Sequence, residues 1–259
     1  VDFFRRHGHA RLGIQISHSG RKGSARRPWE GRGEALTAGE DAWGTVSASD
    51  LPFDEGWPQP AVLDADGMAA VREAFAQSTR RAARLGFDLV GIHIPHGYMP
   101  PGFLSPLCNR RGDAYGGSLE NRMRFPLEVF DGMRAEWPQH RPLGVRISAT
   151  DWVDGGWTLE DACEFARRLK ARGCDFITVS SGGTSLKQKI TLGEGFQLPL
   201  AAAVRQAADL PVMGVGMLFD PVHANRVIAE GQCDLAAIAR GMLHDPHWAW
   251  RAAAALGGE

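Results

Sequence analysis

Two histidines and a tyrosine lie close together where an apolar run of the sequence ends. The segment GIHIPHGYMPP, residues 91–101, contains His93, His96 and Tyr98. Such a cluster could bind a metal, could be two satisfied core histidines, or could clamp an anion with imidazole N–H groups aimed at one oxygen. No acidic or cysteine residue stands at metal-ligand spacing, so we predict no metal. We favour the clamp, with Tyr98 as a neutral proton donor because a phenol has an ordinary pKa of about 10.

Two more polar residues sit inside apolar runs. Arg146 lies in VRIS and Gln15 lies in IQIS. A buried guanidinium needs an anion or several acceptors, so Arg146 serves either an ion pair of the fold or a bound anion. An amide both donates and accepts, so Gln15 either reads the edge of a heterocycle or satisfies backbone groups.

The last two strand ends share one pattern: glycine, a small turn, Asp-Pro and a helix. The two copies are VMGVGMLFDP, residues 212–221, and AIARGMLHDP, residues 237–246. Glycine lets backbone N–H groups approach phosphate oxygens, the helix N-terminus adds a favourable dipole, and arginine adds a charged fork. The alternative is two ordinary turns with a surface arginine. We favour a phosphate site that includes Gly214, Gly216 and Arg240.

Six apolar runs are predicted strands, at residues 11–17, 88–94, 143–149, 175–181, 211–216 and 235–240. Helical patterns follow most of them, at 67–85, 118–137, 159–172, 198–208 and 221–230. Ser118, Asp220 and Asp245 are predicted N-caps, and Pro126 is expected to kink its helix. Repeated βα units imply a parallel sheet, doubly wound or closed into a (β/α)₈ TIM barrel. Catalytic groups of such a barrel lie at the carboxyl ends of its strands.

One connection, residues 18–66, is long and carries little helical pattern. It contains Trp29, Trp43 and Trp57 among turn residues. A connection of this length is often functional. It is either a loop with its own aromatic cluster or a lid over the active site with a short hairpin.

The net charge, the cysteines and the length of the apolar stretches indicate which kinds of partner the protein binds. The chain has 259 residues and a net charge of −1, which gives no basic field for nucleic acid and no polybasic patch for a membrane. The four cysteines form no CxxC pair and no apolar stretch is long enough to span a bilayer, so we expect a cytoplasmic protein acting on a small molecule.

The residues quoted above, taken together, resemble a known family. The run HGYMPPGFLSPLCNRRGDAYGGSLENRMRFPLEVFD, residues 96–131, is similar to the signature of the Old Yellow Enzyme family of FMN-dependent NAD(P)H:flavin oxidoreductases. GIQISHSGRKGS, RISATDW, VSSGG, GVGM and ARGML follow the family's pattern in its order. Within the family, the chain looks closest to the bacterial class with a His–His pair. Its RKGSARRPWEG stretch is also similar to the reductase part of salicylyl-CoA and 2-aminobenzoyl-CoA hydroxylases.

The resemblance implies a (β/α)₈ barrel, FMN as cofactor and NAD(P)H as hydride donor. It implies reduction of the C=C bond of α,β-unsaturated carbonyl compounds, with His93 and His96 on the substrate oxygen and Tyr98 as proton donor. Its implied cofactor-binding residues are Gln15, Lys22, Arg146, Gly214, Gly216, Met217, Ala239 and Arg240.

The chain departs from the family's pattern at three places. Met99-Pro100-Pro101-Gly102 replaces an apolar run without proline, and Ala239 replaces a glycine. The family's first two βα units are absent, which agrees with six strands rather than eight. We therefore interpret residues 1–259 as a single barrel domain lacking those units.

Three functional hypotheses remain open. The first is an ene-reductase, and the second is the reductase module of an aryl-CoA monooxygenase. The third is an inactive barrel fragment without flavin. The chain could also form a homo-oligomer or be fused to a monooxygenase domain.

Overall fold

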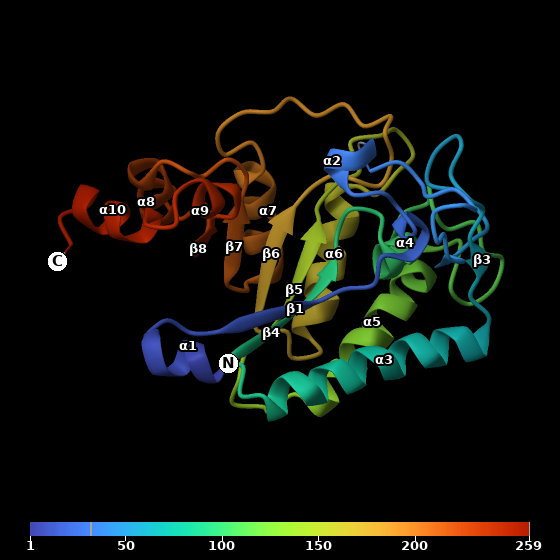
Figure 1. Ribbon diagram of the computed structural model, residues 1–259, viewed down its shortest axis with the longest axis horizontal. Coiled ribbons are helices and arrows are strands. Elements are labelled where there is room, and N and C mark those ends of the chain that lie inside the picture. The colour runs from blue at the N-terminus through green and yellow to red at the C-terminus, as the bar shows by residue number, and fades with distance from the viewer. Residues whose placement is uncertain (32, 259) are drawn as a thin grey trace.

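The fold is built on a six-stranded, all-parallel sheet. In the computed structural model, which describes residues 1–31 and 33–258, the order across the sheet is β1-β4-β5-β6-β7-β8 (Figure 1). All six predicted strands and their parallel pairing are confirmed. Their bounds are β1 Gly13–Ile16, β4 Leu89–Ile94, β5 Leu143–Ser148, β6 Phe176–Ser180, β7 Val212–Val215 and β8 Leu235–Ala237.

Five helices follow the strands as the sequence predicts. They are α3 (Ala65–Arg84), α5 (Leu119–Glu136), α6 (Leu159–Lys170), α7 (Leu198–Ala208) and α8 (Pro221–Ala229). The first four pack side by side in that order, and α7 contacts β6 and β7. Ser118 and Asp220 cap α5 and α8, accepting from the N–H groups of Asn121 and His223. α5 runs through Pro126 as one helix.

Alternation along the strands separates two faces of the sheet. Successive side chains of a strand point to opposite faces. Val90, Ile92 and Ile94 on β4 are buried. The apolar side chains at the matching register positions of β5 and β6 are buried as well. This outer face carries the hydrophobic core. On the other face, the concave face, His93 and Arg146 are only partly buried.

Three aspartates tie the strands together at their amino ends. Asp175 donates its N–H to the carbonyl of Leu143 (2.9 Å), and its carboxylate accepts from the N–H of Leu143 (2.7 Å). The same two-bond arrangement joins Asp88 to Leu12 and Asp234 to Val212. The carboxylates pair with the arginines at positions 5, 134 and 205. We call Asp88, Asp175 and Asp234 the base aspartates.

The 18–66 connection contains η1 (Gly20–Lys22), α2 (Pro28–Gly31), β2 (Val46–Ser47) and β3 (Ala61–Val62). An isolated antiparallel bridge pairs Ala25 with Ala35 in this connection, whereas β2 and β3 pair in parallel. The chain leaves β2, travels through residues 48–60 and re-enters in the same direction. A two-residue turn cannot make that connection.

Four further short helices lie in the described part of the chain. They are α1 (Asp2–His7), α4 (Met99–Leu104), α9 (Arg240–His244) and α10 (Trp248–Ala255), and α8, α9 and α10 gather beside β7 and β8 (Figure 1). The expected N-cap at Asp245 is wrong: Asp245 ends α9, and its carboxylate accepts from the N–H of His247 and pairs with Arg251.

All four cysteines are free thiols. No helix in the described part of the chain combines the length and the apolar character that a bilayer crossing needs.

Candidate functional site

One row of side chains crosses the concave face of the sheet. His93 on β4 is in register with Arg146 on β5, and Arg146 is in register with Thr178 on β6. The row continues to Met213 on β7, whose sulfur accepts from the Thr178 hydroxyl (3.7 Å). The imidazole and the guanidinium that the sequence singled out are therefore neighbours.

Gln15 reaches this row from the edge strand. It is in register with Gly91, one layer below His93, and its Oε1 lies 2.6 Å from Nδ1 of His93. A Cβ on Gly91 would lie 3.8 Å from the Gln15 amide nitrogen, which is an ordinary van der Waals contact. The other ring nitrogen of His93, Nε2, is shielded from solvent and has no hydrogen-bond partner.

His96 turns back over the end of the sheet. Its backbone is left-handed, with φ of +67°, and its N–H donates to the Ser148 hydroxyl (3.1 Å). Gly183, also left-handed, packs so closely that a Cβ there would lie 2.7 Å from Cβ of His96. Only glycine permits this approach. The ring centroids of His93 and His96 are consequently 5.3 Å apart.

The His96 ring is held by Ser180. Its Nε2 lies 3.2 Å from the Ser180 oxygen. The single hydroxyl proton of Ser180 is donated to the carbonyl of Ile147 (2.9 Å). The serine oxygen therefore accepts from Nε2–H of His96, which leaves Nδ1 as the lone-pair nitrogen of the neutral ring.

Tyr98 and Lys22 close the other side of the cluster. The Tyr98 ring centroid is 5.3 Å from that of His93, and the Lys22 ammonium lies 5.0 Å from the Tyr98 ring centroid and 4.4 Å from that of Phe53. Lys22 also donates to the carbonyls of Gly183 (2.9 Å) and His96 (3.2 Å). Lys22 thus joins the 18–66 connection to the loops that follow β4 and β6.

Burial keeps both imidazoles neutral. Desolvation, helped by the positive charges of Arg146 and Lys22, lowers the pKa of His93 to about 4 and that of His96 to about 3. Desolvation and the charge of Arg21 lower the pKa of Lys22 to about 8. Near neutral pH, the charged groups at this site are Arg146 and Lys22.

The predicted phosphate-binding residues lie at the ends of two paired strands. Val215 on β7 is in register with Ala237 on β8, so the segments that follow them are neighbours. Gly216 (φ +136°) and Met217 (φ +56°) have backbone conformations that bend the chain away from β7. A Cβ on Gly214 would meet the Cys233 sulfur at 3.0 Å. Ala239 precedes α9 and Arg240 opens it, and both are exposed.

The structure thus brings the predicted residues together in two groups. Gln15, Lys22, His93, His96, Tyr98 and Arg146 form one group over β1, β4 and β5. The glycine segments and Arg240 form the other over β7 and β8.

Sequence reasoning missed two side chains that organise these loops. Gln197 accepts from the Ser181 hydroxyl (2.8 Å) and donates to the carbonyl of Val215 (2.9 Å), which ties the loop after β6 to β7. Arg21 is buried and donates to the carbonyl of Thr184 (3.0 Å) and to the sulfur of Cys108 (2.9 Å). The GRKG motif could have signalled Arg21, whereas nothing in the local pattern marks Gln197.

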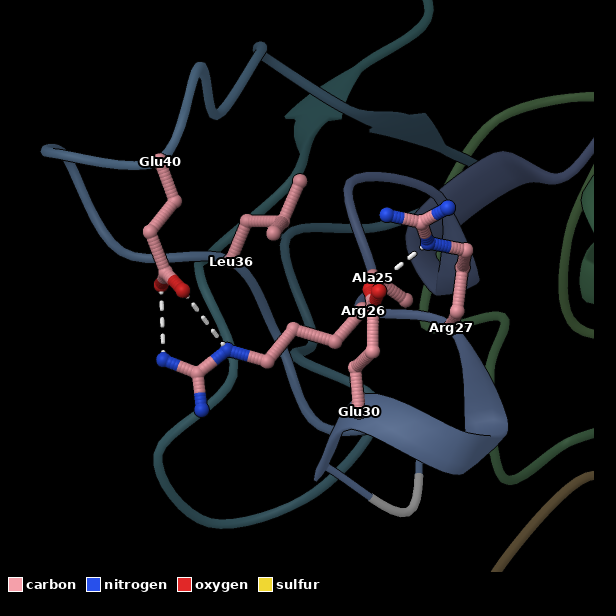
Figure 2. Close-up of a pocket in the computed structure, with 6 residues that line it drawn as sticks. All are labelled: Ala25, Arg26, Arg27, Glu30, Leu36 and Glu40. Atoms are coloured by element: carbon pink, nitrogen blue, oxygen red, sulfur yellow. Dashed lines mark hydrogen bonds and ion pairs between the residues drawn. The ribbon is translucent and has the colours of Figure 1, made fainter.

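A separate cavity of about 590 Å³ lies within the 18–66 connection. Figure 2 shows both of its arginines in ion pairs, Arg26 forked onto the Glu40 carboxylate (2.7 and 2.9 Å) and Arg27 bound to Glu30 (2.6 Å). Its lining, which includes Ala25 and Leu36, shares no residue with the two groups above.

The concave face fits a flavin with a phosphate tail. Nε of Arg146 and Nε2 of His93 are both buried without a partner, and such atoms are costly unless a ligand supplies one. The positively charged guanidinium of Arg146 and the amide of Gln15 lie on the same part of the concave face. The glycine segments and Arg240 lie at the neighbouring strand ends and could hold a phosphate with backbone N–H groups and positive charge.

Comparisons with known proteins identify the family of the chain. Residues 6–258 match the sequence profile of the family described as NADH:flavin oxidoreductase / NADH oxidase. An NADPH dehydrogenase of Geobacillus thermodenitrificans is 38% identical over 257 residues, which cover 99% of this chain and 70% of the relative. An NADPH dehydrogenase of Bacillus subtilis is 36% identical over 250 residues, covering 96% of this chain and 68% of the relative.

Solved structures agree as well. Morphinone reductase superposes with a TM-score of 0.74 at 27% identity, over 98% of this chain and 67% of its own. A 2-naphthoyl-CoA reductase complex superposes with a TM-score of 0.80 at 26% identity, over 95% of this chain, which spans only 38% of that longer protein. The chain therefore belongs to the NADH:flavin oxidoreductase / NADH oxidase family, the Old Yellow Enzyme family of TIM-barrel FMN-dependent NAD(P)H oxidoreductases.

Proposed function

We propose that this oxidoreductase reduces the activated C=C bond of α,β-unsaturated carbonyl compounds. The observation that carries the proposal is the convergence of His93, His96 and Tyr98 beside Arg146, at the carboxyl ends of β4 and β5. Reduction of an enone builds negative charge on its oxygen and needs a proton at Cα. Two imidazoles and a phenol are suited to these two tasks.

FMN, when bound, would supply the hydride chemistry. The protein residues bind, orient and exchange protons. His93 and His96, which we call the imidazole clamp, hold the substrate oxygen, and Tyr98 delivers the proton to Cα. Arg146 holds positive charge against the cofactor, with Gln15 beside it. Gly214, Gly216, Met217, Ala239 and Arg240 hold the phosphate.

The 18–66 connection forms one wall of this site in our proposal. It contributes Lys22 and Phe53, and the Lys22 hydrogen bonds to the carbonyls of His96 and Gly183 hold it against the rim. A segment anchored in this way would exclude water from the substrate, which is the role of a lid.

Turnover of cyclohexenone with NADPH tests the proposal. Replacing His93 or His96 by alanine should lower turnover more than about 100-fold, because one donor to a developing oxyanion contributes about 2.7–4 kcal/mol. His140→Ala, at an exposed histidine in a turn, is the matched control and should retain full activity. Wild-type turnover in both clamp variants would show that the carbonyl is not held there.

A second candidate substrate is a dearomatised aryl-CoA thioester. The superposition on a 2-naphthoyl-CoA reductase favours it. Comparing an unsaturated acyl-CoA with the methyl ester of the same acid separates the two candidates. A kcat/KM at least tenfold higher for the CoA thioester would favour this second function.

A further inference from the structure

The imidazole clamp has both of its N–H groups committed within the protein. Gln15 presents Oε1 to Nδ1 of His93 at 2.6 Å, and an amide oxygen only accepts, so Nδ1 carries the proton. Ser180 gives its proton to Ile147 and accepts from Nε2 of His96. In neutral rings the remaining nitrogens, Nε2 of His93 and Nδ1 of His96, are acceptors. A carbonyl oxygen is also an acceptor, so this arrangement cannot bind it.

Either protonation or a change of tautomer would turn the clamp into a donor. Protonation to imidazolium is opposed by burial beside Arg146, which already places a cation next to His93. A change of tautomer needs local rotations of the two partners and, in each ring, the loss of a proton from one nitrogen to solvent water and the gain of a proton from water on the other. Turning the Gln15 amide by about 180° replaces its oxygen with its NH₂ group at almost the same place. Nδ1 of His93 then accepts, and Nε2 carries the proton.

We propose that Gln15 and Ser180 are positioning residues that set the tautomers of His93 and His96. They switch the neutral clamp from acceptor to donor when a substrate oxygen arrives. For His96, the Ser180 hydroxyl turns from the carbonyl of Ile147 to Nε2, and the ring proton moves to Nδ1. No net proton is taken up, because each ring loses a proton from one nitrogen and gains one on the other.

Two observations link this switch to the site. Nε2 of His93, the atom whose character changes, is the buried ring nitrogen that lacks a partner. Oε1 of Gln15 faces His93 while its amide nitrogen lies 3.8 Å from the Cβ position of Gly91, so a turn of the amide exchanges donor and acceptor at both places. The role of the switch in substrate binding rests on the proposed function. The histidine tautomers of the ligand-free protein can be measured whether or not that function is correct.

Long-range ¹H–¹⁵N correlation spectra of the FMN-loaded protein with ¹⁵N-labelled histidine test the switch. The resonances are assigned with His93→Gln and His96→Gln. In the ligand-free wild type, we expect the proton on Nδ1 of His93 and on Nε2 of His96. Saturation with para-hydroxybenzaldehyde, whose phenolate oxygen only accepts, should move each proton to the other ring nitrogen.

Variants without the positioning groups should lose this response. In Gln15→Met, His93 should already carry its proton on Nε2 without ligand, and in Ser180→Ala, His96 should leave the Nε2–H form. Gln77→Met, at a glutamine on the exposed face of α3 that bonds Glu73, is the control and should keep the wild-type spectrum. If Gln15→Met loads FMN poorly, Gln15→Asn serves instead, because its shorter side chain withdraws the amide from His93.

Three results would overturn the inference: unchanged tautomers in the phenolate complex, both ring nitrogens protonated in that complex, or a wild-type pattern for His93 in Gln15→Met. Failure of the phenolate to bind, seen as an unchanged flavin absorbance, would instead contradict the proposed function. The comparison of ligand-free wild type with Gln15→Met would still decide the role of Gln15.

Discussion

His93 and Arg146 occupy the same register position on neighbouring parallel strands, so an imidazole and a guanidinium lie side by side on the concave face. A protonated imidazole would repel the guanidinium at this partly buried position. The arginine keeps its charge because an unperturbed guanidinium has a far higher pKa than imidazole. This pairing therefore makes the histidine the neutral partner and leaves Arg146 as the anion-binding group.

Arg146→Met should weaken FMN binding about 10- to 100-fold. A hydrogen bond to a charged group contributes about 1.5–3 kcal/mol, and the guanidinium Nε has no protein partner to replace a lost ligand. Quenching of FMN fluorescence on titration into apoprotein measures the change. Arg81→Met on exposed α3 is the control. Equal affinity in the two variants would remove Arg146 from the cofactor site.

Acidification should destabilise the protein through the imidazole clamp. The pKa values of His93 and His96 are lowered in the fold, to about 4 and about 3, while the unfolded chain protonates near the ordinary value of 6.5. The unfolded state therefore binds more protons as the pH falls from about 7 to about 5, and stability drops. After allowance for solvent screening, we expect a loss on the order of 1 kcal/mol per histidine.

Urea unfolding at both pH values measures this loss. The double variant His93→Asn, His96→Asn should show a shallower pH dependence than the wild type, whereas His140→Asn should follow the wild type. An unchanged slope in the double variant would mean that the two rings titrate normally.

Activity should fall as the pH rises through about 8, where Lys22 loses its proton. The ammonium has three donors and places two of them on the carbonyls of His96 and Gly183, so the neutral amine holds the loops less firmly. The pH profile of kcat/KM measures this effect. Lys22→Arg should retain activity above pH 8, because arginine stays charged. A profile for Lys22→Met identical to that of the wild type would exclude Lys22 as the titrating group.

Asp175→Ala should cost about 1–3 kcal/mol of stability without weakening FMN binding. The change removes the acceptor for the buried N–H of Leu143 and the carboxylate that pairs with the largely buried Arg134 (3.0 Å). Chemical denaturation measures the loss. Asp131→Ala breaks a more exposed pair with Arg172 and should cost at most about 1 kcal/mol. Similar costs for both variants would contradict a structural role for the base aspartates.

The sequence predicted the strands and main helices because continuous apolar runs and capped amphipathic segments report local structure and burial directly. It also predicted Arg146 and the His93 cluster, since a polar residue within an apolar run is conspicuous. It missed α4 at Met99–Leu104, a helix whose first turn contains two prolines, which are well tolerated at that position.

Relationships between distant segments were harder to predict. The contact between Gln15 and His93 joins residues 78 positions apart and depends on the register of two parallel strands. The close approach of Gly183 to His96 joins loops after β4 and β6 that no local pattern connects. The parallel pairing of β2 and β3 was missed for the same reason, since short strands in a turn-rich segment carry no signal of direction.

The base aspartates have a consequence for redesign of the protein. They stabilise the amino ends of the strands, whereas the proposed active site lies at the carboxyl ends. The stability of the fold and the choice of substrate therefore depend on different residues. The part of the rim loop between Gly183 and Gln197 should therefore be exchangeable between relatives, or open to random mutagenesis, with little penalty in yield, provided that these two residues, the base aspartates and their arginines are kept.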